Sequence, residues 1–501
     1  MAQITNKTLV EKALGCLLDS KFEPILDMVI TKSDKESFLI ANSKGKVEFR
    51  RFKAGENYQF EILDLEGNNP VQNQDPSYLS KLSDQLNLPY PKNEENSYPY
   101  AFENIAQVWD HEHAPDIVCV HSASHNWEEE GGHLGEHGSL GVIQMRAPFI
   151  IGGCGIKKSG CQSGHCRVTD VAPSILKVLG AKPLKITDDT EFFLKSQQGK
   201  SLDSLFSGDK PELVIGFLLD GSNSAVLYNL IDQKQLPALG YITENGTWLS
   251  DGMLATFPSV TLPNHTAIMT SSFPGEHKIL HNAWYDRESD CQIVTESPAT
   301  WHTAMNWLSP NVETIWQALA RNFPEEIFIS INEPADKGAT YSTFDLFRSN
   351  RLVELMPDLT KPPSRTNLEF FNGSENYKNG SYADEVGLRQ VIEILRGSFL
   401  GQSYKTPKLL WYSMTVTDAA FHHGGPYSEI ARASIIDSDK RISEVLNLLS
   451  EKQLLEKTMF LVVADHGMQI SDKSVKGNWG QSLKNAGIAF RDESYGFIYL
   501  L

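Results

Sequence analysis

Four short, mainly apolar runs stand out in the second half of the chain. They cover residues 213–219, 326–331, 408–413 and 458–464, and longer stretches of mixed polar and apolar positions separate them. Runs of this length are typical of strands buried on both faces, and the stretches between them are long enough for crossover helices. The pattern predicts an α/β fold in which a mostly parallel central sheet carries helices on both faces.

The first 100 residues show a different pattern. Apolar positions at helical spacing lie between residues 9 and 18, and two apolar-rich stretches within 38–50 flank Ser43-Lys44-Gly45. Two such stretches around a short turn predict a β-hairpin. Residues 65–100 are rich in Asn, Pro, Ser and Asp, as surface loops are. We expect residues 1–100 to form a small α+β unit inserted beside the main domain.

The rest of the chain divides into three further segments. Short apolar runs at 116–120 and 147–153 predict strands, and a helical pattern over 170–180 ends in glycine. A polar stretch rich in Lys, Asp and Ser follows, with the composition of a linker. The predicted organisation is therefore a unit at 1–100, a core segment at 101–180, a linker at 181–210 and the main core segment at 211–501.

Net charge and hydropathy exclude some classes of binding partner and argue against a membrane-spanning segment. The formal net charge of -18 argues against a nucleic-acid polymer, because binding a phosphate backbone requires a basic surface. No stretch reaches the roughly 18 uninterrupted apolar residues of a membrane span, and residues 1–7 lack the apolar centre of a signal peptide. We expect a cytoplasmic protein without a membrane segment, although a chain trimmed at its N-terminus would look the same.

Three of the six cysteines cluster at Cys154, Cys161 and Cys166, with His165 beside the last. Cysteine and histidine are zinc ligands, but these spacings are not those of paired C-x-x-C knuckles. Free thiols or one local disulfide are the alternative interpretation.

Acids follow three of the predicted strands. Asp220, Asp418 and Asp465 lie at or just beyond strand ends, where open α/β sheets bind their ligands. His466 follows Asp465 directly, and His422 lies four residues after Asp418, on the same face if a helix begins there. An aspartate with a histidine is half of a zinc site. Taken singly, each pair also fits a helix cap with a neighbouring histidine.

Thr261 precedes a segment of small and apolar residues that predicts a helix. A helix N-terminus offers free N–H groups and a positive dipole end to an anion. A threonine hydroxyl held there beside a metal can lose its proton and attack phosphorus. The simpler alternative is an ordinary N-cap.

Together these motifs resemble the type I phosphodiesterase/nucleotide pyrophosphatase family of the alkaline phosphatase superfamily. The resemblance lies in Val214–Gly221, Thr261-Leu262-Pro263-Asn264-His265, Asp418–His422 and Asp465-His466-Gly467-Met468. It implies an alkaline-phosphatase-like fold and two Zn²⁺ ions, with other divalent metals as an alternative. One ion would be held by Asp220, Thr261, Asp465 and His466, and the other by Asp418, His422 and His137.

His137, the last of these ligands, does not lie where the family's order of motifs would place it. In the family, a Gly-x-His-Gly motif follows the Asp-His-Gly-Met motif, but no histidine follows His466 here. Gly135-Glu136-His137-Gly138 matches the motif near the other end of the chain. We interpret this as a circular permutation in which joining residue 501 to residue 1 restores the family order. His133 is the competing candidate for His137, and a fragment of a tandem duplication is the alternative to permutation.

The resemblance implies a hydrolase of phosphoric ester bonds, specifically a phosphodiesterase or nucleotide pyrophosphatase that forms a covalent phospho-threonine at Thr261. Asn282 matches the family's asparagine that contacts a phosphoryl oxygen. The expected partner is a small phosphate ester or phosphonate. A phosphonate hydrolase, a phosphomonoesterase and a non-catalytic binding relative remain alternatives. Four aromatic residues in 283–312 would either stack on a nucleobase or fill the core: Trp284, Tyr285, Trp301 and Trp307.

Overall fold

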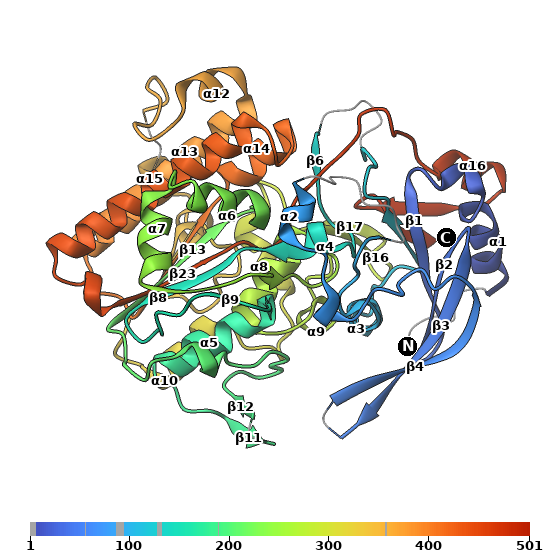
Figure 1. The fold of residues 1–501 in the computed structure, drawn as a ribbon, viewed down its shortest axis with the longest axis horizontal. Helices are drawn as coiled ribbons and strands as arrows, with labels where there is room; N and C mark the ends of the chain where they lie inside the picture. The colour runs from blue at the N-terminus through green and yellow to red at the C-terminus, as the bar shows by residue number, and fades with distance from the viewer. Residues whose placement is uncertain (1–6, 56, 87–94, 128–132, 189, 356–357) are drawn as a thin grey trace.

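A computed structural model describes residues 7–55, 57–86, 95–127, 133–188, 190–355 and 358–501. The described chain builds two large sheets, which lie on opposite sides of the view in Figure 1. The larger has eight strands in the order β19-β18-β22-β13-β23-β8-β14-β9. Their bounds are β8 (Phe149–Gly153), β9 (Gly160–Gln162), β13 (Leu213–Leu219), β14 (Gly246–Leu249), β18 (Phe328–Ile331), β19 (Tyr341–Ser342), β22 (Leu409–Met414) and β23 (Thr458–Val463).

The centre of this sheet is parallel, as the apolar runs predict. β13 pairs in parallel with β22 on one side and with β23 on the other, and β18 and β19 continue the parallel ladder beyond β22. β8 is antiparallel to β23, so the sheet is mixed at that end. All seven residues of β13 are buried, which explains why its sequence shows no alternation of polar and apolar positions.

Helices cover both faces of the larger sheet, which confirms the predicted α/β class. Side chains of β13 alternate between two hydrophobic clusters: Val214 and Leu218 pack into one, and Ile215 and Phe217 into the other. The first cluster includes α5 (Val171–Val178), α8 (Thr261–Thr270) and α10 (Ile315–Asn322). The second includes α6 (Ser224–Asp232), α7 (Pro237–Glu244), α13 (Glu375–Arg396), α14 (Val416–Gly424) and α15 (Glu429–Glu451).

The smaller sheet is antiparallel and joins both ends of the described chain. Its order is β25-β26-β5-β1-β2-β3-β4. The predicted hairpin is confirmed, since β2 and β3 pair with Phe38 opposite Phe49 and Asn42 opposite Gly45. The bounds are β1 (Leu26–Asp34), β2 (Ser37–Asn42), β3 (Gly45–Ala54), β4 (Asn57–Gly67), β5 (Ile117–His121), β25 (Phe490–Glu493) and β26 (Phe497–Leu500).

The four predicted segments meet across these sheets. β5 from segment 101–180 and β25–β26 from segment 211–501 belong to the smaller sheet, beside the strands of residues 1–100. β8 and β9 from segment 101–180 belong to the larger sheet. The predicted linker 181–210 contains a small hairpin of β11 (Lys185–Thr187) and β12 (Thr190–Phe192), which projects from the body in Figure 1. The segment boundaries themselves stay predictions.

Among the described residues, no helix combines the length and the apolar character that a membrane crossing requires. All six cysteines are free, so Cys154, Cys161 and Cys166 form no disulfide. No cysteine belongs to the groups of potential metal ligands in the described part of the chain.

Candidate metal centre

Three carboxylates meet at one edge of the larger sheet. Asp220 follows β13, Asp465 lies two residues beyond β23, and Asp418 stands in the first turn of α14, just after β22. Because β13 lies between β22 and β23 and runs parallel to both, its carboxyl end is flanked by theirs. The predicted convergence of the acids therefore follows from the order of the strands.

Asp220, Asp465 and His466 form the first half of the centre. One ligand atom of each lies within 4.8 Å of the others. His466 Nε2 is 3.1 Å from Asp465 Oδ2 and 3.8 Å from Asp220 Oδ1. The other oxygen of Asp465 accepts a hydrogen bond of 3.1 Å from the Gly221 amide. That bond turns Asp465 Oδ2 toward His466, and both side chains are fully buried.

His137 brings the second half together from the other end of the sequence. It follows β6 (Gly135–Glu136), which pairs with β24 (Gln469–Ile470), only a few residues after Asp465-His466. His137 Nε2 lies 3.1 Å from His422 Nε2 and 3.9 Å from Asp418 Oδ1, and His422 Nε2 is 3.4 Å from the same oxygen. The His137 ring also stacks on His466, with ring centroids 3.8 Å apart.

The hydrogen bonds of these imidazoles indicate which ring nitrogen carries the proton. His137 Nδ1 faces the Ser259 carbonyl at 3.1 Å, and His422 Nδ1 faces the Gly135 carbonyl at 2.8 Å. A carbonyl oxygen only accepts, so each Nδ1 carries the proton and each Nε2 presents a lone pair. The two Nε2 atoms, 3.1 Å apart, are placed so that one cation could bind both. This is how backbone carbonyls orient histidine ligands in metal sites.

The shifted pKa values within the cluster also indicate a site for cations. Burial raises the pKa of Asp220 well above its usual range, and the neighbouring Asp465 and Asp418 add to the effect. Burial also raises the pKa of Asp418 to about 6. Burial lowers the pKa of His137 well below its usual value, with His466 and His422 contributing, so this ring is neutral. Two buried carboxylates and the partly buried Asp418, beside the neutral His137 ring, need cations to balance their charge.

Several of these donor atoms are buried without a hydrogen-bond partner among the described residues. Such atoms are rare in folded proteins and call for an explanation. Hard carboxylate oxygens together with bare imidazole nitrogens are a ligand set for zinc and similar divalent ions. The residues present therefore fit divalent cations. The atoms are Asp220 Oδ1, Asp418 Oδ1, Asp465 Oδ2, His265 Nε2 and His466 Nε2.

Thr261 is the first residue of α8, beside this cluster. The carbonyl that accepts from His137 belongs to Ser259, two residues earlier, which ties the start of α8 to the metal ligands. Asn282 Oδ1 accepts a 3.1 Å hydrogen bond from the amide of Leu262, the residue after Thr261. The nucleophile candidate and the phosphoryl-binding candidate are thus neighbours. One amide at the start of α8 is already engaged by Asn282 rather than turned to a ligand.

His265 and Glu333 belong to the same centre and were not assigned a role from the sequence. His265 Nε2 lies 3.7 Å from Asp465 Oδ2 and 3.9 Å from Asp220 Oδ2. Its Nδ1 faces Glu333 Oε2 at 2.8 Å, and Glu333 is wholly buried. Glu333 lies just beyond β18, the next parallel strand along the same edge, so the signal that identified the three aspartates also applies to it.

The competing candidates lie nearby but are less central. His133, Glu136 and His422 form a third group whose ligand atoms lie within 4.8 Å of one another, whereas His137 is grouped with Asp418 and His466. Among the aromatic residues of 283–312, Trp284 and Tyr285 are buried core residues, as the core-filling alternative has it. Trp301 is partly buried and Trp307 is 44% exposed.

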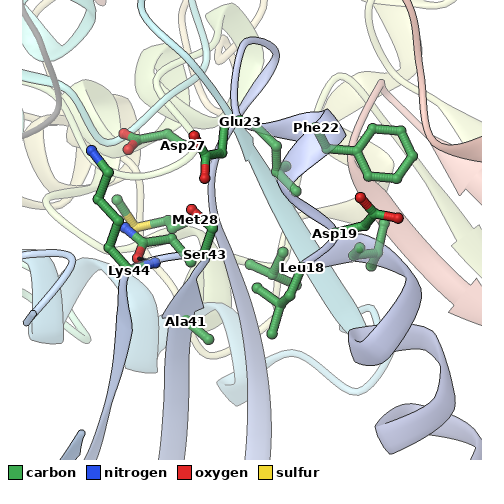
Figure 2. A pocket seen from close by; sticks show the side chains of 13 residues that line it. Leu18, Asp19, Phe22, Glu23, Asp27, Met28, Ala41, Ser43 and Lys44 are labelled. Atoms are coloured by element: carbon green, nitrogen blue, oxygen red, sulfur yellow. Dashed lines mark hydrogen bonds between the residues drawn. The ribbon is translucent and has the colours of Figure 1, made fainter. Parts of the chain in front are cut away.

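Another concave site lies elsewhere in the protein. A cavity of about 240 Å³ between α1 (Lys7–Leu17) and the smaller sheet is lined by Asp19, Glu23, Asp27 and Lys44, together with apolar side chains such as Leu18 and Met28 (Figure 2). Asp27 is engaged there by the Tyr98 hydroxyl at 2.8 Å. The cavity shares no residue with the metal centre.

Comparison with known proteins agrees with the motifs. The sequence profile of type I phosphodiesterases/nucleotide pyrophosphatases matches residues 214–500, more than half of the chain. The chain belongs to the type I phosphodiesterase/nucleotide pyrophosphatase family. The profile match includes Asp220, Thr261, Asp418 and Asp465 and excludes His137.

Individual relatives of this phosphodiesterase-family chain are distant. It is 26% identical over 236 residues to ectonucleotide pyrophosphatase/phosphodiesterase 1 of Saccharomyces cerevisiae, a match covering 45% of this chain and 29% of the yeast protein. A solved structure of murine ectonucleotide pyrophosphatase/phosphodiesterase 5, an inactive variant in complex with AMP, matches 57% of this chain and 66% of its own with 18% identity and a TM-score of 0.41. Phosphonoacetate hydrolase from Sinorhizobium meliloti, in complex with phosphonoformate, matches 55% and 59% with 19% identity and a TM-score of 0.35.

Proposed function

We propose that the protein is a metal-dependent phosphodiesterase of the nucleotide pyrophosphatase type, with two zinc ions and Thr261 as nucleophile. The observation that carries the proposal is the convergence of six Asp and His side chains beside the start of α8, with their donor atoms turned toward one another. Family membership supports the reaction class. Asp220, Thr261, Asp465 and His466 would hold one ion, and Asp418, His422 and His137 the other.

The chain's own residues supply the nucleophile and its alignment. Bound zinc would lower the pKa of the attacking hydroxyl and stabilise the charge on the leaving oxygen. Thr261 Oγ1 gives up its proton to solvent and forms a bond to phosphorus while the bond to the leaving alkoxide breaks, and the alkoxide takes a proton from solvent. Water then attacks the phospho-threonine, the bond from phosphorus to Oγ breaks, and Thr261 recovers its proton. Asn282 Nδ2 donates to a non-bridging oxygen in both steps.

The proposal is tested by hydrolysis of bis-p-nitrophenyl phosphate and p-nitrophenyl phosphate with the zinc-loaded full chain. We expect the wild-type protein to prefer the diester, and Thr261→Ala to lose more than about a thousandfold in kcat/KM while it keeps its zinc. Thr266→Ala, one turn and a half further along α8, is the matched control and should stay active. Zinc-loaded wild type that hydrolyses neither ester would overturn the proposal and favour a phosphonate substrate.

We further propose that the order of the family's elements is circularly permuted in this chain. The family profile begins at residue 214 and includes every proposed metal ligand except His137, yet β8 from residues 149–153 lies between β23 and β14 in the same sheet. The chain near His137 likewise pairs with β24 through β6. Sequence-distant segments thus complete one sheet and one site, as a permuted domain requires.

A further inference from the structure

Glu296 is an acidic residue close to the reacting groups that is not among the proposed metal ligands. It follows β17 (Cys291–Val294), the second strand of a hairpin with β16 (Ala283–Asp286), and Asn282 directly precedes β16. The pairing of Ala283 with Val294 brings Asn282 and Glu296 to the same end of the hairpin. Glu296 donates its backbone N–H to the Asn282 carbonyl at 3.2 Å, so this closeness is built into the backbone.

The side chains of this pair connect Glu296 to the start of α8. Asn282 Nδ2 lies 3.4 Å from Glu296 Oε2, at the long end for a hydrogen bond, and Asn282 Oδ1 accepts from the Leu262 amide at 3.1 Å. An amide oxygen held by an N–H donor and an amide nitrogen beside a carboxylate define one orientation of the Asn282 side chain. One side chain therefore separates the Glu296 carboxylate from the residue next to Thr261.

Glu296 also interacts with the acids of the metal centre. Burial raises the pKa of Glu296 to about 7, and the charge of Asp418 adds to the effect. The charge of Glu296 in turn contributes to the raised pKa of Asp220. Glu296 is only half-buried and belongs to none of the metal-ligand groups in the described part of the chain. Its carboxylate is thus held beside Asn282, within electrostatic range of Asp418 and Asp220, and belongs to none of these ligand groups.

We propose that Glu296 is a specificity-determining residue that selects monoanionic phosphodiesters against dianionic phosphomonoesters. This inference rests on the proposed function. A carboxylate beside the phosphoryl-binding Asn282 repels every anionic substrate, but the repulsion grows with substrate charge. A diester carries one negative charge and a monoester two, so the penalty falls more heavily on the monoester. Specificity gained by a repulsive element of this kind is common in selective sites.

The test compares Glu296→Gln with wild type in the zinc-loaded full chain at pH 8, above the pKa of about 7. Glutamine keeps the length of the side chain and an oxygen near Asn282 Nδ2, and it removes the charge. We expect kcat/KM for p-nitrophenyl phosphate to rise about tenfold relative to kcat/KM for bis-p-nitrophenyl phosphate. Glu288→Gln makes the same charge change at an exposed position in the turn of this hairpin and should leave the ratio unaltered.

Binding of inorganic phosphate provides a readout that needs no turnover. Calorimetric titration of the zinc-loaded proteins with phosphate should show affinity about tenfold tighter in Glu296→Gln than in wild type, and unchanged in Glu288→Gln. Equal changes for both esters, or unaltered phosphate affinity in a variant with full zinc content, would overturn the role of Glu296. If wild type hydrolyses the diester through Thr261 but Glu296→Gln has the same ratio of monoesterase to diesterase kcat/KM as wild type, only this inference is refuted. A wild type inactive on both esters would refute the proposed function, and phosphate affinity would still decide the role of the charge.

Discussion

Every imidazole among the proposed metal ligands donates its Nδ1 proton to a backbone carbonyl. The acceptors are Ser259 for His137, Gly135 for His422 and Gly467 for His466, at 3.1, 2.8 and 3.0 Å. Each ring is thereby held with Nε2 toward the centre. The arrangement sets the tautomer before any cation binds, which lowers the reorganisation needed for binding.

His265 departs from this pattern, because a carboxylate takes the place of the carbonyl. Glu333 accepts from His265 Nδ1, and it also accepts from the Ser413 hydroxyl at 2.9 Å and from the Ala335 amide at 2.9 Å. Burial alone would lower the pKa of His265, but the Glu333 carboxylate raises it overall. The pair therefore holds His265 Nε2 against the carboxylates of Asp220 and Asp465.

Replacing Glu333 should weaken metal binding at that half of the centre. In Glu333→Gln the charge that orients His265 is lost, and the carboxylates of Asp220 and Asp465 lose their fixed neighbour. We expect zinc affinity at one of two sites to fall by about 10–100-fold, measured by competition with a chromogenic chelator.

The control for this change is Glu313→Gln. Glu313 is also buried, but it pairs with Arg321 at 3.1 Å and lies outside the centre. Its replacement should lower stability without altering zinc affinity. Equal zinc affinity in wild type and Glu333→Gln would show that the pair serves packing only.

Candidate functional residues could be predicted from the sequence where they follow the end of a strand. Asp220, Asp418 and Asp465 were predicted from apolar runs that stop at or near an acid, and Glu333 carries the same signal without having been assigned a role. Glu296 carries no such signal. Its position depends on the register of the β16–β17 hairpin. The local sequence does not show which residues of two strands pair, so this register could not be predicted.

At the scale of elements, the main strands were predicted to within one or two residues. The run at 213–219 is β13, and the runs at 326–331, 408–413 and 458–464 contain or overlap β18, β22 and β23. These strands are buried on both faces, so hydrophobicity alone identifies them. The attachment of β25 and β26 to β5 was not predicted, because their pairing joins segments more than 370 residues apart, such as Ile498 and Ile117.

Two features of the fold bear on the proposed circular permutation. Both ends of the described chain lie on the same side of the molecule in Figure 1, and Leu17 of α1 and Leu500 of β26 share one hydrophobic cluster. The β11–β12 hairpin projects from the body and contributes to neither large sheet. These are the surroundings in which permutation is tolerated.

We therefore expect a re-permuted chain to fold. Joining residue 501 to residue 1 through a flexible linker and opening the chain in the turn between β11 and β12 should keep the zinc content. The thermal midpoint should stay within a few degrees of wild type. A second variant opened inside β13, between Phe217 and Leu218, should fail to fold. Loss of zinc from a folded protein opened at β11–β12 would argue against the permutation.

At the scale of the whole molecule, one site is assembled from both ends of the sequence. Its acids come from the carboxyl ends of β13, β22 and β23, and His137 comes from the loop after β6. Pairing of β6 with β24 places that loop beside Asp465-His466. The proposed second metal position would therefore be complete only when the segment before residue 181 packs onto the segment after residue 211.

The most direct test of this assembly is the zinc content of the purified full chain, measured by mass spectrometry after metal loading and removal of free metal. The measurement compares wild type, His137→Ala and His133→Ala. The account predicts two zinc ions per chain in wild type and in His133→Ala, and one in His137→Ala. Two ions retained in a folded His137→Ala protein, or none in wild type, would contradict it.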